Sequence, residues 1–189
     1  MPRICVFCGS QAGTNSLYRQ TAVDMGRLLA RRGYGLVYGG GQVGLMGVIA
    51  DAVLASGGEV IGVIPESILA REIPHTGVTQ LHIVSGMHER KARMATLADA
   101  FIALPGGYGT FEELFEVITW AQLGLHSKPI GLLNVAGYFN ALKALVEHAS
   151  AEGFIRSEHR RLLTIADASA LLLDTLGLGD GRAMINRPA

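Results

Sequence analysis

The sequence predicts an α/β fold in which a mainly parallel sheet of about seven strands carries helices on both faces. Segments with strand-like and helix-like hydrophobic patterns alternate along the chain. Several strand-like segments, such as 60–64 and 101–104, are continuous apolar runs, as in parallel strands covered by helices on both sides. The glycine-rich turns all follow strand-like segments. Together these observations indicate a doubly wound, Rossmann-like sheet, which binds ligands beyond the carboxyl ends of its strands.

The individual elements follow from local pattern. Each predicted strand is a short run rich in β-branched, aromatic or other apolar residues, and each predicted helix repeats apolar residues at intervals of three and four. The predicted strands are 3–8, 34–38, 59–64, 79–84, 100–104, 129–133 and 162–165. The predicted helices are 16–32, 44–56, 87–98, 110–124, 138–151 and 167–176. We therefore expect one domain over residues 1–176 and a frayed tail over 177–189.

Composition and charge narrow the class of protein. Of 189 residues, 49% are apolar, 17% are charged and 25 are glycine, which indicates a globular chain and excludes a disordered or fibrous one. The 16 basic residues equal the 16 acidic ones, so no overall field attracts nucleic acid or a membrane surface. The longest uncharged run, 33–50, is too rich in glycine to be a membrane span. The chain enters its first strand without a secretory leader pattern, so we expect a cytoplasmic protein.

Residues 100–114 form the most informative segment. An apolar run ends at Pro105, three glycines follow within four residues, and a helix is predicted to begin at Thr110. Glycines allow close approach of the backbone, and the free N–H groups of the following helix then face a bound anion. This junction therefore predicts an anion site, most often one for phosphate.

Two acidic residues, Glu112 and Glu113, are predicted in the first turn of that helix. Carboxylates beside a phosphate indicate chemistry on a nucleotide or a sugar phosphate. A structural interpretation is equally open, because Thr110 and Glu113 have the Thr-x-x-Glu spacing of a capping box. Glu112 is also an acid that the helix dipole favours.

A second glycine-rich loop, residues 39–47, contains the spacing G-x-G-x-x-G. Alone, this is a weak signal for a dinucleotide, because the acid expected after the next strand, Glu66, lies beyond a proline. The phosphate of a mononucleotide is the favoured ligand. We expect Ser10, Gly40 and Gly41 to contact it, since their turns lie at the same edge of the sheet.

The two cysteines, Cys5 and Cys8, form a C-x-x-C pattern within a predicted strand. Residues three apart in a strand point to opposite faces, whereas redox pairs open a helix and a zinc site needs further ligands. Buried apolar thiols are therefore the favoured interpretation, with Cys8 near the ligand edge. No metal or cofactor is expected.

Upstream, Arg90 and Lys91 lie near the start of the helix predicted at 87–98. Cations there oppose the helix dipole, so a nearby anionic ligand would explain them. Solvated surface charges are the alternative.

Two motifs in the chain are typical of the same protein family. Residues 105–113 fit P-G-G-x-G-T-x-x-E, and residues 87–91 fit M-H-x-R-K. The chain resembles the LOG ("Lonely guy") family of cytokinin riboside 5′-monophosphate phosphoribohydrolases over essentially its full length. The segments Val6–Ser10, Tyr38–Gly41 and Thr119–Gly124 are similar to that family as well.

This resemblance implies hydrolysis of the N-glycosidic bond of N6-substituted AMP, which releases the free base and ribose 5-phosphate. It also implies that Arg90 and Glu113 are the catalytic pair. The substrate-binding residues that it implies are Glu72, Lys91, Gly106, Gly107, Tyr108, Gly109, Thr110, Phe111, Glu112 and Thr119. A carboxylate such as Glu113 suits this reaction, because cleavage passes through an oxocarbenium-like ribose.

Members of this family are often labelled lysine decarboxylases. That reaction needs pyridoxal phosphate on a lysine as an electron sink. Only Lys91, Lys128 and Lys143 exist, and their sequence contexts argue against it.

Two further classes stay open: a nucleosidase of plain AMP or another nucleotide, and a nucleotide-binding protein without turnover. The helices predicted at 87–98 and 110–124 carry apolar residues on more than one face, which, together with the family resemblance, predicts a homodimer that buries them near the active site. These residues include Met94, Phe115, Trp120 and Leu123.

Overall fold

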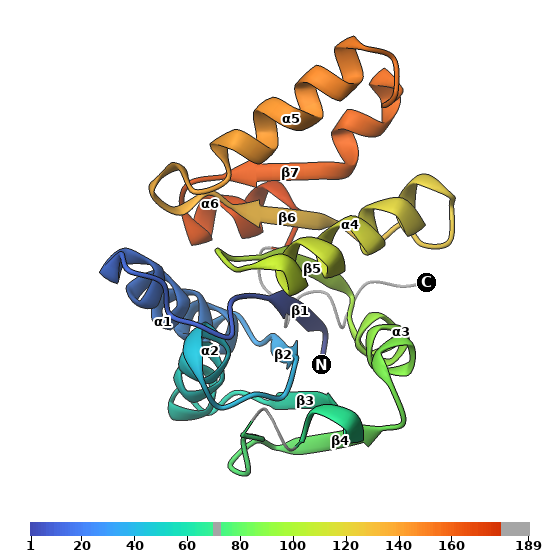
Figure 1. The fold of residues 1–189 in the computed structure, drawn as a ribbon. Helices are drawn as coiled ribbons and strands as arrows, with labels where there is room; N and C mark the ends of the chain where they lie inside the picture. Colours follow the sequence, from blue (N-terminus) through green and yellow to red (C-terminus); the bar gives the residue numbers. More distant parts are fainter. Residues whose placement is uncertain (70–72, 179–189) are drawn as a thin grey trace.

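The computed structural model describes residues 1–69 and 73–178, which contain a seven-stranded sheet surrounded by helices (Figure 1). The strands are β1 (Arg3–Phe7), β2 (Gly35–Tyr38), β3 (Val60–Pro65), β4 (Gln80–Val84), β5 (Ala100–Ala103), β6 (Ile130–Leu133) and β7 (Leu163–Ala166). The helices are α1 (Ser16–Arg31), α2 (Gly44–Ala55), α3 (Met87–Leu97), α4 (Tyr108–Gln122), α5 (Asn140–Ala151) and α6 (Ser169–Thr175). Short 3-10 helices are η1 (Glu66–Ile68), η2 (Val135–Gly137) and η3 (Ser157–Leu162). The predicted fold class is confirmed.

The order of the strands places the ligand edge. The sheet runs β4-β3-β2-β1-β5-β6-β7, and every pairing is parallel. The chain therefore builds one wing outward from β1, returns through α3 to β5 and builds the other wing. The strand order reverses between β1 and β5, which is the point where open α/β sheets bind their ligands.

Helices cover both faces of the sheet, as predicted. One apolar cluster joins α1, α2 and α6 to the sheet, and a second joins α3, α4 and the start of α5 to the opposite face. Side chains alternate between the clusters along each strand. Cys8 belongs to the first cluster and Cys5 to the second, and both are free thiols, as the strand interpretation required.

The inner strands explain the continuous apolar runs in the sequence. Every residue of β2, β3, β5 and β6 is buried, whereas β4 and β7 at the sheet edges are only partly covered. Complete burial of one large apolar side chain contributes about 1.5–3 kcal/mol. Burial in the core therefore stabilises the inner strands, and the glycine-rich loops extend from the ends of these strands.

Helix α4 corrects one prediction. It begins at Tyr108 rather than Thr110, and Gly107 occupies the N-cap without a side-chain hydrogen bond. Glu112 and Glu113 therefore lie in the second turn, and the first turn contains no acid. The capping-box interpretation is wrong, because Thr110 already lies inside the helix.

The apolar residues that predicted an additional helix face have different roles. Met94 is 2% exposed and belongs to the core, and Trp120 packs against the same core. Phe115 on α4 and Leu123 directly after it are 40% and 65% exposed. Phe115 and Leu123 therefore leave apolar area available for a partner.

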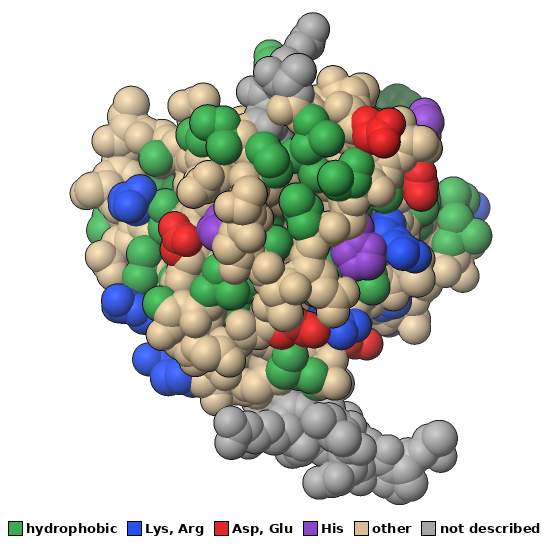
Figure 2. Space-filling model, turned by 90° about the horizontal axis from the view of Figure 1, so that it is seen from below, with side chains coloured by type: hydrophobic (Ala, Val, Ile, Leu, Met, Phe, Trp, Pro, Cys, Tyr) green, Lys and Arg blue, Asp and Glu red, His purple; other side chains and the backbone are tan. Residues whose placement is uncertain are grey.

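The surface matches the balanced composition. On the face shown in Figure 2, acidic and basic side chains are scattered among apolar ones. None of the helices in the described residues has the length and apolar character needed to cross a membrane.

The tail predicted at 177–189 lies mostly outside the described residues. Leu178 is buried, and its carbonyl accepts a hydrogen bond from Arg32 at 3.1 Å.

Candidate active site

The loops after β1 and β5 meet at the point where the strand order reverses. The Gly9 amide donates to the Pro105 carbonyl at 3.1 Å. A Cβ on Gly106 would lie 2.9 Å from the Gly9 nitrogen and 2.0 Å from the Thr110 hydroxyl. The close contact of the two loops therefore requires glycine at position 106 and places Thr110, which is buried, beneath it.

A cavity of about 250 Å³ lies between these loops. Its walls include residues 9–13, Gly106, Gly107, Tyr18 and Tyr138. The Tyr138 hydroxyl donates to the Gly106 carbonyl, and the rings of Tyr18 and Tyr138 pack edge to face at 5.6 Å. The predicted contacts Ser10, Gly106 and Gly107 are thus brought together around one cavity.

The N-terminus of α4 is open to a ligand. No side chain caps it, and a Cβ on Gly107 or Gly109 would meet nothing within 4 Å. Tyr108, between them, is 92% exposed. Uncapped N–H groups and the positive end of a helix dipole in open space form a favourable place for a phosphate.

Arg90 on α3 is buried beneath the ends of two strands. Its Nε donates to the Val63 carbonyl at 3.1 Å, and its Nη2 donates to the Gly39 carbonyl at 3.2 Å. The residue is only 7% exposed. A buried guanidinium is stable only when its donors have partners, and these carbonyls supply two.

Glu113 on α4 provides the opposite charge. Its Oε1 lies 3.5 Å from Nη1 of Arg90, and the residue is 9% exposed. The structure therefore brings together the two residues that the family motifs identify as the catalytic pair. Loss of one member of a buried pair leaves an uncompensated charge, which typically costs about 3–5 kcal/mol.

The two thiols near this pair are chemically inert. Burial raises the pKa of Cys5 and of Cys8, and the negative charge of Glu113 raises both further. A thiol becomes a nucleophile only as the thiolate. Neither cysteine is therefore an activated nucleophile near neutral pH.

Lys91 links α3 to α4. Its Nζ lies 2.5 Å from a carboxylate oxygen of Glu112 and 2.9 Å from one of Glu116. The hydrogen bond with Glu112 is the main cause that raises the pKa of Lys91. The ammonium is thus held charged between two acids at the rim of the site.

The second glycine loop supports Arg90 and the first loop. A Cβ on Gly39 would lie 2.1 Å from Nη2 of Arg90, and one on Gly44 would lie 2.3 Å from the Ser10 carbonyl carbon. The first amide beyond Gly44, that of Leu45, donates to the Gly9 carbonyl at 3.0 Å. Close packing against Arg90 and against the first loop therefore explains why glycine occupies positions 39 and 44, and no dinucleotide is needed to explain it.

Gly40 and Gly41, predicted to contact the ligand, are covered by residues 73–75. The Gly40 carbonyl accepts from the His75 amide at 2.9 Å, and Gly41 pairs with Pro74 in an isolated bridge. Both glycines are buried. Their contacts within the chain are therefore structural.

The remaining predicted residues lie apart from this centre. Phe111 packs against the core. Thr119 is exposed, and its hydroxyl donates to the Phe115 carbonyl of its own helix at 2.7 Å. Six residues beyond Glu113, it faces another side of α4. Glu72 lies outside the described residues.

Several residues that contact the site residues or hold the loops in place have no recognisable sequence signal. The Val63 carbonyl and the tyrosines Tyr18 and Tyr138 carry no motif, because their roles depend on tertiary contacts. His75 was also missed: its Nε2 lies 3.0 Å from Asp51, and its Nδ1 accepts from the Gly77 amide. This histidine fastens residues 73–77 to α2 over the second glycine loop.

The fold and this arrangement define a Rossmann-like α/β protein with an uncapped, glycine-rich helix N-terminus where its strand order reverses. Residues 46–176 match the model of a family described as "Possible lysine decarboxylase".

The chain is 54% identical over 171 residues to the cytokinin riboside 5′-monophosphate phosphoribohydrolase LOG of Oryza sativa subsp. japonica, covering 90% of this chain and 71% of that protein. It is 53% identical over 174 residues to the phosphoribohydrolase LOG1 of Arabidopsis thaliana, covering 92% of this chain and 82% of the relative. The chain belongs to the LOG family.

Solved structures share the fold at lower identity. A molybdenum cofactor binding protein from Rippkaea orientalis superposes with a TM-score of 0.70 at 21% identity, over 98% of both chains. The molybdenum cofactor carrier protein of Chlamydomonas reinhardtii gives 0.68 at 22% identity, over 94% of this chain and 97% of that one. These similarities concern the fold alone.

The lysines do not fit the decarboxylase description. A Schiff-base lysine needs a lowered pKa, whereas the pKa of Lys91 is raised by its carboxylate partner. The Lys128 ammonium donates to the Ala95 carbonyl at 2.7 Å, and Lys143 lies on α5 with Nζ 3.9 Å from Glu147. None of the three lysines lines the cavity between the glycine loops.

The position of Arg90 leads to a prediction about Gly39. Gly39→Ala should displace the guanidinium from the Gly39 carbonyl and lower the free energy of unfolding by about 1–3 kcal/mol, as overpacking does. Gly109→Ala is the matched control, because its Cβ enters open space and alanine favours a helix. Urea unfolding curves compare the two variants. Equal midpoints for Gly39→Ala and the wild type would contradict the contact.

Proposed function

We propose that this protein hydrolyses the N-glycosidic bond of an N6-substituted AMP, a cytokinin riboside 5′-monophosphate, to the free base and ribose 5-phosphate. The observation that carries the proposal is the buried Arg90–Glu113 pair, in which Glu113 lies less than two helical turns after the glycine-rich N-terminus of α4. The names of the relatives, at 53–54% identity over nine-tenths of the chain, support the same reaction.

In the proposed mechanism, the N-terminus of α4 holds the 5′-phosphate through free backbone amides. This contact fixes the ribose near the Glu113 carboxylate. Positioning of this kind replaces an encounter in solution with a reaction inside one complex.

As the bond between C1′ and the base breaks, positive charge develops on C1′ and the ring oxygen. The Glu113 carboxylate stabilises this charge and accepts a proton from the attacking water, whose oxygen bonds to C1′. The base departs with the bonding electron pair and takes up a proton equivalent to the one that Glu113 received from the water, so Glu113 returns to its carboxylate form. Water is the only co-reactant.

Arg90 has a positioning role in this scheme. Its Nε and Nη2 already donate to main-chain carbonyls, and its Nη1 faces Glu113. It holds the carboxylate at a fixed distance from the end of the sheet.

A substrate panel tests the proposal. Release of free base is measured for N6-isopentenyl-AMP, AMP, IMP, CMP and N6-isopentenyl-adenosine. We expect the highest kcat/KM for N6-isopentenyl-AMP. A preference for AMP would instead indicate a nucleosidase without a cytokinin role, and binding without release of any base would indicate a nucleotide-binding protein.

The 5′-phosphate should be essential. Loss of the charged hydrogen bonds at α4 should lower kcat/KM for adenosine at least about 100-fold relative to AMP, since charge-assisted bonds are among the strongest. Steady-state kinetics on both compounds measure this ratio. Equal values would contradict a phosphate site at the glycine-rich loop.

Glu113→Gln should lower kcat by about 10²–10³, the usual effect of losing an electrostatic stabiliser. The melting temperature should fall as well, because Arg90 loses its counter-charge. Rates are therefore measured well below the melting temperature of the variant.

Glu59→Gln is the matched control, because Glu59 pairs with Arg3 at 2.7 Å at the amino ends of the strands. Its kcat should equal that of the wild type. Wild-type turnover in Glu113→Gln would remove this residue from the chemistry.

We also propose a homodimer formed through α4. Phe115 on α4 is 40% exposed, and Leu123 and Leu125 just beyond the helix are 65% and 69% exposed. Thr119 lies between them, so a dimer would place this family-motif residue at the interface.

Light scattering at micromolar concentration should give twice the monomer mass, and the double variant Phe115→Asp, Leu123→Asp should give the monomer mass. A wild-type monomer would overturn the proposal.

A further inference from the structure

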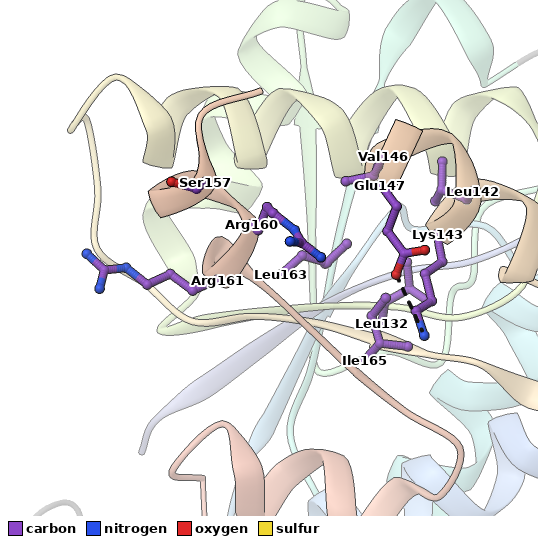
Figure 3. Close-up of a pocket in the computed structure, with 10 residues that line it drawn as sticks. All are labelled: Leu132, Leu142, Lys143, Val146, Glu147, Ser157, Arg160, Arg161, Leu163 and Ile165. Carbon is purple, nitrogen blue, oxygen red and sulfur yellow. Dashed lines mark ion pairs between the residues drawn. The ribbon is translucent and has the colours of Figure 1, made fainter. Parts of the chain in front are cut away.

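A cavity of about 480 Å³ lies beneath α5, remote from the candidate active site (Figure 3). Its walls come from α5, η3, β6 and β7. Helix α5 is twelve residues long, yet none of its residues is buried, because the helix stands over the edge of the sheet with this space below it. The volume lies in the range of small-molecule sites, about 300–1,000 Å³.

The floor of the cavity is apolar. It is formed by Leu132 of β6, Leu163 and Ile165 of β7, and Leu142 and Val146 of α5. Leu132 is completely buried, whereas the other four are only partly covered. Apolar area left accessible inside a concave surface favours a ligand with an apolar body.

The rim is cationic. Lys143, Arg160 and Arg161 line it, with Glu147 as the single acid. Nζ of Lys143 lies 3.9 Å from Oε1 of Glu147, so the charges of these two side chains compensate each other. Figure 3 shows Arg160 directed toward α5 across the cavity and Arg161 directed away from it. Within the described part of the chain, Arg160 forms no ion pair.

We propose that this cavity is a second ligand site, which takes a small molecule with an apolar body and a single carboxylate. The paired charges of Lys143 and Glu147 cancel, so Arg160 leaves the interior with about one positive charge. A guanidinium binds a carboxylate through two parallel hydrogen bonds. Glu147 disfavours a dianion such as a phosphate monoester.

The site is independent of the proposed reaction. Its lining shares no residue with the cavity between the glycine loops or with the Arg90–Glu113 pair. In Figure 1, α5 and β7 lie at the opposite side of the sheet from β3 and β4. A ligand here would leave the ends of β1, β2 and β5 accessible.

Calorimetric titration of the full chain with decanoate tests the proposal, with decanol as the neutral probe of the same body. We expect one saturable decanoate site and binding of decanol at least about tenfold weaker, since a charge-assisted pair is lost. Excess AMP should not displace decanoate. Absence of saturation, equal binding of both probes, or displacement by AMP would each overturn the proposal.

Variants assign the site to this cavity. Arg160→Ala should weaken decanoate binding about tenfold, the loss of one charge-assisted contact. Arg156→Ala is the matched control, because Arg156 lies on the same segment, is 77% exposed and pairs with Glu158 outside the cavity. It should bind decanoate as the wild type does. Equal affinities of the two variants would overturn the proposal.

Val146→Trp should fill the cavity and abolish binding while circular dichroism shows a native fold. If light scattering gave the Val146→Trp variant a different oligomeric mass from the wild type, the cavity would belong to a contact between copies of the chain. That result would overturn the proposal.

Discussion

The site depends on how one buried guanidinium is held. Arg90 enters from α3, donates to carbonyls that follow β2 and lie within β3, and faces a carboxylate on α4. One side chain thus joins two strands and two helices that are far apart in the sequence. Because a charge without partners in this position would be costly, these four elements are constrained to one arrangement.

This constraint explains residues that have no direct chemical role. A Cβ at position 39 would lie 2.1 Å from Nη2 of Arg90, so a residue other than glycine there would displace the guanidinium. Gly44 and Gly106 are required for a similar reason, since each lies against the backbone of the loop after β1. The glycines of these loops therefore have two different structural roles. Gly39, Gly44 and Gly106 allow other segments of the chain to pack closely against them. Gly107 and Gly109 instead leave the N-terminus of α4 accessible.

The same geometry separates two kinds of charge pair near the site. Arg90 and Glu113 are buried and fixed by main-chain carbonyls, which favours preorganised electrostatics. Lys91 joins Glu112 and Glu116 across α3 and α4 nearer the surface, where Glu112 is half-exposed. The acids of Lys91 therefore lie closer to solvent than Glu113 does, although the Lys91 side chain itself is only 11% exposed.

The sequence by itself determined the fold class and the strands to within about one residue at either end, and it predicted at which edge of the sheet the candidate site lies. Hydrophobic periodicity and glycine-rich turns are local properties, and a parallel sheet brings all such turns to one edge. The motifs also identified Arg90 and Glu113.

Only the tertiary structure decided between a cap and a charge pair for Glu113. The Thr110–Glu113 spacing satisfies the capping-box pattern, but the helix begins at Tyr108 and Glu113 faces Arg90. The supports at Gly39, Val63 and Tyr138 were likewise invisible, because each acts on a residue at least 27 positions away in the chain. Local pattern records which backbone a segment prefers, whereas long-range packing selects the contacts that its side chains make.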